Sequence, residues 1–304
     1  MTAMDEDPTF APWDGRRVPV TLVGGYLGSG KTTLINEVLA RTDQPIAILV
    51  NDVGEINIDA RLIARQSGDV VELTDGCVCC SLAAGLVAAF EGLRNRETPP
   101  EHVIVELSGV AAPNRVLQWT RSPGFRLDAV IVVVDGEQFI DRHDDPILAP
   151  LLEQQVRAAD LIAISKADLV DSAALAAVRD RIQTLAPEWC EVTVGHVRSL
   201  AATVGQGSRR PGGIGDLAPS ELFDPHVTET IPLADPISRE ALHDLVAALP
   251  ADTIRAKAVA RHDDRSSSIV HVVGNRTVVE PMPDAEAQAP TDLIVIRIPE
   301  DRRI

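Results

Sequence analysis

The stretch that decides the fold is VPVTLVGGYLGSGKTTLINEVL, residues 18–39. The β-branched run at 18–23 predicts a short buried strand, and the apolar spacing at 32–39 predicts a helix. Between them, residues 25–32 fit the pattern G-x-x-x-x-G-K-[S/T], in the strand, loop and helix context that the pattern requires. The chain is therefore expected to open with the phosphate-binding loop of a P-loop fold.

The residue types in this loop explain why it would bind phosphate. Glycines let backbone amides turn inward around phosphate oxygens, and the helix N-terminus adds positive potential. Lys31 is expected to reach the β- and γ-phosphates and to act in catalysis, and the Thr32 hydroxyl is expected to bind Mg²⁺. The loop residues expected to hold the nucleotide are Gly25, Gly28, Ser29, Gly30, Lys31, Thr32 and Thr33. An ordinary glycine turn is the alternative interpretation.

A second apolar strand, within VIVELSG at 103–109, ends in a carboxylate. P-loop proteins place the acid that holds or orients the Mg²⁺ shell at such a strand end, so Glu106 is the candidate for that role and for catalysis. Gly109 lacks a side chain, so its backbone amide could approach the γ-phosphate and make this loop a sensor of that phosphate.

The strand predicted at 161–165 runs into Ser-Lys-Ala-Asp, close to the N-K-x-D pattern that reads guanine. Asp168 can accept two hydrogen bonds from guanine N1–H and N2–H₂, whereas adenine offers no such donor pair. Lys166 can lay its stem along the base. Ser165 is shorter than the usual Asn, so guanine preference should depend more on Asp168. The alternative is an exposed loop in which Asp168 caps a helix.

Three of the four cysteines lie together in TDGCVCCS, residues 74–81. They precede a helix predicted to begin at Leu82 with Ser81 as its N-cap, and the positive helix end lowers thiol pKa values and favours thiolates. Thiolates bind Zn²⁺ or Co²⁺, and three ligands leave a position open for exchange. The predicted ligands are Cys77, Cys79 and Cys80. Buried small residues or a redox switch are the alternatives, and Cys190 is interpreted as packing.

Composition limits the classes of partner. The net charge of −17 disfavours nucleic acid and anionic membrane surfaces, so neither is expected as a partner. The N-terminal residues lack an apolar run of signal-peptide length, and no segment approaches the roughly 20 apolar residues of a membrane span. We expect a cytoplasmic protein with reduced thiols.

Only three of the 28 basic residues are lysines, and two of these, Lys31 and Lys166, lie in nucleotide motifs.

Further strands are predicted at 46–50, 70–73 and 129–134. Strands that alternate with helical segments predict an α/β fold with a mostly parallel sheet flanked by helices. Near the C-terminus, a helix capped by Ser238, a hairpin turning at Gly274 and Asn275, and a strand at 293–298 predict a small α+β domain.

The domain boundaries follow from these elements and from a Gly-, Pro- and Ser-rich stretch at 205–220. The expected parts are a disordered N-terminal tail at 1–16, a P-loop GTPase domain at 17–204, a flexible linker at 205–226 and a C-terminal α+β domain at 227–304.

On these motifs the chain resembles the CobW-like family of P-loop GTPases, with the C-terminal match looser than the rest. The matching blocks stand in the family's order: GGYLGSGKTTLIN, VNDVGEINID, TDGCVCCSL, VIVELSGVAAP, IVVVDG and QQVRAADLIAISKADL. The resemblance implies GTP-dependent transfer of a metal, zinc or cobalt, to a client metalloprotein. It implies metal binding by the three clustered cysteines, phosphate and Mg²⁺ binding by Lys31, Thr32 and Glu106, and guanine binding by Asp168. Ser165 and the absence of a histidine-rich tract depart from the family, and the second argues against metal storage.

Several alternatives stay open at this point. The acidic residues Asp52, Glu55 and Asp59 could contact Mg²⁺, water or the transferred metal, or could lie on a surface loop. The function could be that of an activator dedicated to one metalloenzyme such as a nitrile hydratase, a nucleotide-gated metal sensor or sink, or an ATP-using kinase or ligase with a structural zinc loop. The client, the physiological metal and the oligomeric state, with a homodimer as one expectation, are not decided by the sequence.

Overall fold

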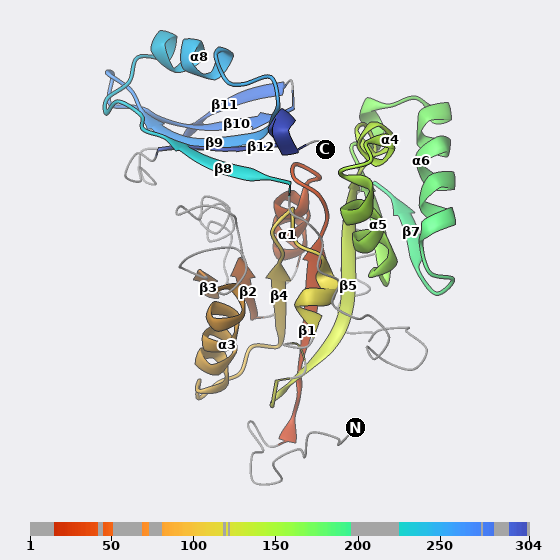
Figure 1. Cartoon of the computed structure of the whole chain (residues 1–304). Helices are drawn as coiled ribbons and strands as arrows, with labels where there is room; N and C mark the ends of the chain where they lie inside the picture. The colour runs from red at the N-terminus through yellow and green to blue at the C-terminus, as the bar shows by residue number, and fades with distance from the viewer. Residues whose placement is uncertain are drawn as a thin grey trace. The chain divides into compact units, whose positions relative to one another are not determined.

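The computed structural model describes residues 15–41, 45–50, 69–72, 81–117, 120, 122–195, 225–274, 276–282 and 292–302. The chain divides into two compact units, Met1–Leu222 and Phe223–Ile304, which run from red to green and from cyan to blue in Figure 1. The predicted tail at 1–16 and linker at 205–226 fall almost entirely outside the described residues, so their boundaries stay predictions.

The first unit contains a seven-stranded sheet in the order β3-β2-β4-β1-β5-β6-β7, and every neighbouring pair is parallel. Its strands are β1 (Val18–Gly24), β2 (Ile46–Val50), β3 (Asp69–Glu72), β4 (His102–Glu106), β5 (Phe125–Asp135), β6 (Leu161–Ser165) and β7 (Glu191–Val194). The predicted α/β class is confirmed. β7 was not predicted from the sequence, because it is a four-residue edge strand with no fully buried residue.

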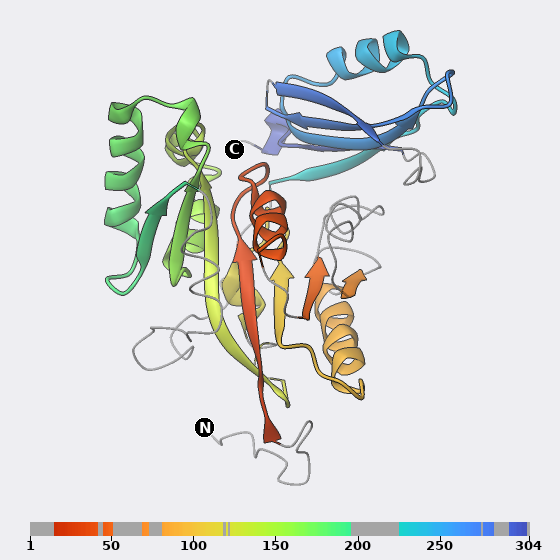
Figure 2. The ribbon, with the colours of Figure 1, turned by 180° about the vertical axis from the view of Figure 1, so that it is seen from behind.

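Helices cover both faces of this sheet. They are α1 (Lys31–Leu39), α3 (Ser81–Arg94), α4 (Phe139–Asp144), α5 (Ala149–Arg157) and α6 (Ser172–Leu185), with short 3₁₀ turns η3 (Pro113–Arg115) and η5 (Ala167–Leu169). α1 packs its Ile35 into the core formed with Ile104 and Ile131, and Figure 2 shows α1 in front of the strands. Figure 1 shows α5 in front of the opposite face. α3 begins at Ser81, one residue before the predicted start.

The strand order creates the position for a ligand. β1 lies between β4 and β5, so the chain leaves β1 through α1 and returns to the sheet beyond β4, as β2. Ligands in open α/β sheets bind at the carboxyl ends of strands where the order reverses in this way. The predicted phosphate loop follows β1 at this edge, and Glu106 and Ser165 end strands β4 and β6 at the same edge.

A buried polar cluster lies elsewhere in the same strands. His102 opens β4, and its Nε2 lies 2.8 Å from Thr21 Oγ1, which in turn lies 3.4 Å from Asp128 Oδ2. Burial lowers the pKa of His102 to about 4; the Asp128 charge opposes this shift and the Arg126 charge adds to it. His102 is therefore neutral in the folded protein at pH 7.

The second unit is a five-stranded antiparallel sheet in the order β11-β10-β9-β12-β8 with one helix. Its elements are β8 (Val227–Ile231), α8 (Arg239–Ala247), β9 (Thr253–Arg261), β10 (Ser267–Val273), β11 (Arg276–Met282), β12 (Leu293–Arg297) and the 3₁₀ turn η8 (Glu300–Arg302). The predicted cap is confirmed, because Ser238 Oγ accepts a hydrogen bond of 3.1 Å from the Ala241 amide. The predicted hairpin at Gly274 and the last strand are also confirmed, whereas β8 and β9 were not predicted.

None of the helices within the described residues is long and apolar enough to cross a membrane.

Candidate functional site

The phosphate loop has the backbone that its glycines allow. Gly25, Gly28 and Gly30 have φ angles of 130°, 74° and 97°, a region that favours glycine. Gly25 also packs directly on β5, where an added Cβ would overlap the Val133 carbonyl oxygen. A side chain at Gly25 would therefore push the loop away from the sheet.

Lys31 lies inside this loop. Its side chain is only 5% exposed, and its Nζ donates to the carbonyl oxygens of Gly25 at 3.0 Å and Tyr26 at 3.3 Å. Both acceptors are uncharged, and a phosphate oxygen is a stronger acceptor for an ammonium group. Ser29 Oγ is buried with no hydrogen-bond partner among the described residues. The loop therefore fits a nucleotide phosphate, while Thr33, also predicted to bind, is exposed on α1.

Thr32 and Glu106 meet at the mouth of the loop although they are 74 residues apart in the sequence. The Thr32 hydroxyl donates to Glu106 Oε1 at 2.9 Å, and the Glu106 side chain is buried. Glu106 stands beside Val23 of β1 and Val50 of β2 in the parallel ladders. A hydroxyl and a carboxylate are ligands or outer-shell partners that Mg²⁺ uses beside phosphates, so these two residues fit the ion.

The loop that follows β4 presses against the phosphate loop. A Cβ added to Gly109 would lie 2.7 Å from the backbone nitrogen of Leu27 and 2.9 Å from its Cα, closer than real Cβ atoms come. Ser108 is buried, and its carbonyl accepts a 2.9 Å hydrogen bond from the Ala111 amide in a tight turn. The structure therefore places the predicted γ-phosphate sensor next to the predicted phosphate loop.

The predicted base-reading segment is joined to the phosphate loop by Ser165. Its hydroxyl donates to the Ser29 carbonyl oxygen at 2.6 Å, and it also lies 3.2 Å from the Val134 carbonyl oxygen. This serine therefore links the main chain of the phosphate loop to that of β5, a role that was not predicted from the sequence. Asp168 lies in η5 and is exposed, so a base could reach its carboxylate.

Asp135, at the end of β5, is a site residue that the sequence analysis missed. It is 3% exposed, and its Oδ2 accepts from Lys166 Nζ at 2.7 Å. Its Oδ1 accepts from the backbone amides of Glu137 at 3.0 Å and Gln138 at 3.3 Å. The signal was available, because IVVVDG is an apolar strand that ends in an acid, the same pattern that pointed to Glu106.

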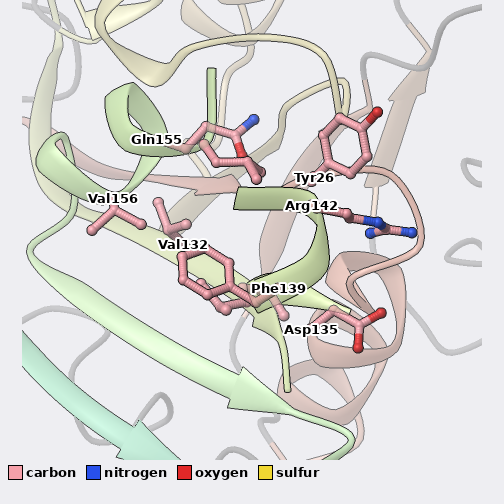
Figure 3. A pocket seen from close by; sticks show the side chains of 10 residues that line it. Tyr26, Val132, Asp135, Phe139, Arg142, Gln155 and Val156 are labelled. Carbon is pink, nitrogen blue, oxygen red and sulfur yellow. The ribbon is translucent and has the colours of Figure 1, made fainter. Parts of the chain in front are cut away.

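Arg142 on α4 holds the other side of the phosphate loop. Its Nη1 donates to the Leu27 carbonyl oxygen at 3.1 Å, its guanidinium lies 4.9 Å from the centre of the Tyr26 ring, and it also bonds to Gln138 Oε1. Burial lowers the pKa of Arg142 from its usual value, although neighbouring acidic groups oppose this. In Figure 3 Arg142 lies next to Tyr26, beside a pocket behind the loop.

This pocket is too small for a ligand of its own. It leaves about 10 Å³ for the centre of a water-sized molecule, near the lower limit for one water. Figure 3 shows Gln155 of α5 at the end of the pocket away from Asp135. Two of the polar side chains around it, Arg142 and Gln155, donate hydrogen bonds to the main chain of neighbouring loops.

Several predicted residues lie outside the described residues, and their geometry stays a prediction. They are Asp52, Glu55, Asp59, Cys77, Cys79 and Cys80. Within the part of the chain that is described, no three His, Cys, Asp or Glu residues gather closely enough to hold a metal. Cys190, partly exposed, directly precedes β7.

Comparison with known proteins gives a family match over more than half of the chain. The family description "CobW/HypB/UreG, nucleotide-binding domain" matches residues 19–191. A zinc chaperone CobW from Sinorhizobium is 33% identical over 198 residues, covering 55% of this chain and 56% of that protein. A zinc chaperone CobW from Pseudomonas aeruginosa is 34% identical over 200 residues, covering 55% and 53%. The chain thus spans about half the length of the curated relatives it matches.

One solved structure supports the fold. The crystal structure of the Zn(II)-bound YjiA GTPase from Escherichia coli aligns with a TM-score of 0.50 at 18% sequence identity. The alignment covers 95% of this chain and 97% of that one, so the similarity extends over both units.

Proposed function

Because the chain belongs to the CobW/HypB/UreG nucleotide-binding domain family, we propose that it binds and hydrolyses GTP with Mg²⁺ and couples this cycle to the transfer of a transition metal to a client protein. Zinc is the first choice of metal and cobalt the second, since two relatives are named zinc chaperones. The observation that carries the nucleotide part is the Thr32–Glu106 hydrogen bond at the mouth of the phosphate loop.

The chain's own residues have distinct tasks in this proposal. Lys31 and the loop amides hold the β- and γ-phosphates, and Thr32 and Glu106 would hold Mg²⁺ and its shell. Bound Mg²⁺ would neutralise charge on the phosphates. Gly109 would bring its amide to the γ-phosphate, so that the loop after β4 responds to the difference between GTP and GDP.

Guanine would be selected at the other end of the nucleotide. Asp168 would accept hydrogen bonds from N1–H and N2–H₂ of guanine. With adenine bound, the Asp168 carboxylate would lose its hydrating water and gain no such hydrogen bonds in return. The Ser165 hydroxyl supports this arrangement because its 2.6 Å bond to Ser29 holds the base-reading segment at a constant distance from the phosphate loop.

Metal transfer is assigned to the three clustered cysteines at 77–80, which precede α3. Three thiolates could bind a zinc or cobalt ion and leave one position for a ligand of the client. Coupling between nucleotide and metal must be reciprocal, so metal should tighten GTP binding by the factor by which GTP tightens metal binding.

The nucleotide half is tested by measuring the affinities of the purified protein for GTP and ATP. We expect a clear preference for GTP, and Asp168→Asn should weaken GTP binding and favour xanthine nucleotides. Equal affinity of the wild type for GTP and ATP would contradict the proposal.

The metal half is tested with Co²⁺, whose thiolate charge-transfer absorption reports binding directly. We expect one Co²⁺ per chain, bound more tightly with a non-hydrolysable GTP analogue than with GDP. Replacing Cys77, Cys79 and Cys80 together with Ser should remove the absorption, whereas Cys190→Ser, the matched control, should leave it unchanged. Stoichiometric binding that survives the triple replacement would leave a GTPase without this metal site.

A further inference from the structure

Gln155 is an unusual side chain for its position. It lies on the buried face of α5, where its buried neighbours are Leu151, Leu152 and Val156, and it is 1% exposed. An apolar residue such as leucine or methionine would fit the amphipathic pattern of this helix at position 155. A buried side-chain amide is unfavourable unless it is hydrogen-bonded. The polar group must therefore be compensated by what it contacts.

The contacts of Gln155 are two main-chain oxygens of the loop after β4. Its Nε2 donates to the Gly109 carbonyl at 3.1 Å and to the Ala111 carbonyl at 3.0 Å. Both hydrogens of the amide are used in this way, and both acceptors belong to one short turn. One side chain of α5 thus restrains two peptide groups of the loop proposed to sense the γ-phosphate.

The loop needs such a restraint because of Gly109. Its packing against Leu27 excludes a Cβ, so only glycine fits, yet glycine also allows the neighbouring peptide groups to rotate most freely. A peptide group is planar and trans, so its C=O and N–H point in opposite directions. A hydrogen bond that holds the Gly109 carbonyl toward α5 therefore fixes the peptide group between Gly109 and Val110, which directly follows the Gly109 amide proposed to meet the γ-phosphate.

We propose that Gln155 is a positioning residue for GTP recognition: it holds the Gly109 turn against the phosphate loop, so that the protein distinguishes GTP from GDP. This inference rests on the proposed function, because it assumes that the γ-phosphate binds at this turn. Gln155 acts through the main chain of the loop, with the pocket between α5 and Tyr26 behind it (Figure 3).

The first test is Gln155→Met, which keeps the length of the side chain and removes both donors. Two hydrogen bonds are lost from a loop proposed to meet the nucleotide only at its γ-phosphate, so affinity for a non-hydrolysable GTP analogue should fall about tenfold. GDP affinity should stay within about twofold, which also shows that the variant is folded. Gln154→Met on the same helix is the matched control, and it should change neither affinity.

The second test uses Gln155→Glu, because a carboxylate can only accept hydrogen bonds whereas a carboxylic acid can donate one. At pH 8 the ionised side chain would face two carbonyl oxygens, and GTP-analogue affinity should be at its lowest. Burial raises the pKa of a carboxyl group, so lowering the pH to about 6 should restore part of the discrimination between GTP analogue and GDP. A side chain that merely fills space, as in Gln155→Met, should show no such recovery.

The outcomes separate this inference from the function on which it rests. If the wild type binds neither GTP nor GDP, the proposed function fails and this inference fails with it. If the wild type binds both, but Gln155→Met keeps the wild-type ratio of GTP-analogue to GDP affinity, only the inference on Gln155 is wrong. A rise in GTP-analogue affinity would also overturn it, because Gln155 would then oppose the GTP-bound loop. If Gln155→Glu lost GDP binding at both pH values, the result with Gln155→Met would decide.

Discussion

Replacing Asp135 with Asn should weaken guanine-nucleotide binding by a defined amount. The substitution is nearly isosteric, and Oδ1 can still accept from the amides of Glu137 and Gln138. The atom that replaces Oδ2 becomes an NH₂ donor facing the Lys166 ammonium, which is itself only a donor. The variant therefore removes the contact that holds Lys166 and leaves the turn after β5 in place.

The size of the effect follows from the burial of the two partners. A hydrogen bond to a charged group contributes about 1.5–3 kcal/mol. The Asp135 side chain is 3% exposed but that of Lys166 is 26% exposed, so solvent screening favours the lower end of this range. About 1.5 kcal/mol corresponds to about a tenfold loss of affinity if all of it is transmitted to the base.

The assay is equilibrium binding of GDP, the GTP analogue and ATP to the wild type and the variant. GDP and GTP-analogue affinities should fall together by up to about tenfold, because Lys166 is expected to contact the base and not the γ-phosphate. The preference for guanine nucleotides over ATP should become smaller. Asp144→Asn is the control, since the Asp144–Arg181 pair has a similar length of 2.8 Å but lies on the surface. GDP affinity within twofold of the wild type would refute the role given to Asp135.

His102 should make the fold sensitive to acid. Its folded pKa of about 4 lies below the ordinary 6.5, so the stability contributed by its neutral form is complete above pH 6.5 and is lost as the pH falls toward 4. The free energy of unfolding should decrease by about 2 kcal/mol between pH 7.5 and pH 5 from this residue alone, and His102→Gln should lose that part of the slope in urea unfolding; parallel curves for the two proteins would contradict this. Separately, Lys31→Ala should abolish nucleotide binding, whereas Glu106→Ala should retain binding and lose Mg²⁺-dependent turnover, since Lys31 neutralises phosphate charge and Glu106 works through the ion. Unchanged turnover in Glu106→Ala, measured as phosphate release, would mean that another residue holds the ion.

The sequence predicted the parts of the site that depend on local pattern. The phosphate loop and Glu106 follow from glycine spacing and from a strand that ends in an acid, and both are properties of a few consecutive residues. The same reasoning would have found Asp135. The small strands β7 and β8 were missed because each is short and half-exposed, with no buried run to separate it from a loop. The longer β9 was also missed, because three of its buried residues are alanines, which are not typical of strands.

The interactions that the sequence could not show join side chains to distant main chain. Ser165 bonds to a carbonyl oxygen 136 residues away, and Gln155 to carbonyl oxygens 46 and 44 residues away. A carbonyl acceptor is the same for every residue type, so no pattern in the sequence marks it. The roles of Ser165 and Gln155 can therefore be recognised only in the folded structure, where the sheet brings the loops together.

Because the chain has only three lysines, a reagent that reacts with amines can be used to probe the nucleotide site. Lys31 and Lys257 are 5% and 8% exposed, which leaves Lys166 as the one lysine with a substantial part of its side chain in contact with solvent. Apart from the α-amino group, an acylating reagent therefore meets a single partly exposed amine, on the lysine that stands two residues before Asp168 in the sequence. The rate at which Lys166 is acylated would thus record how often a base covers it, and mass spectrometry of a single peptide could follow occupancy without any label on the nucleotide.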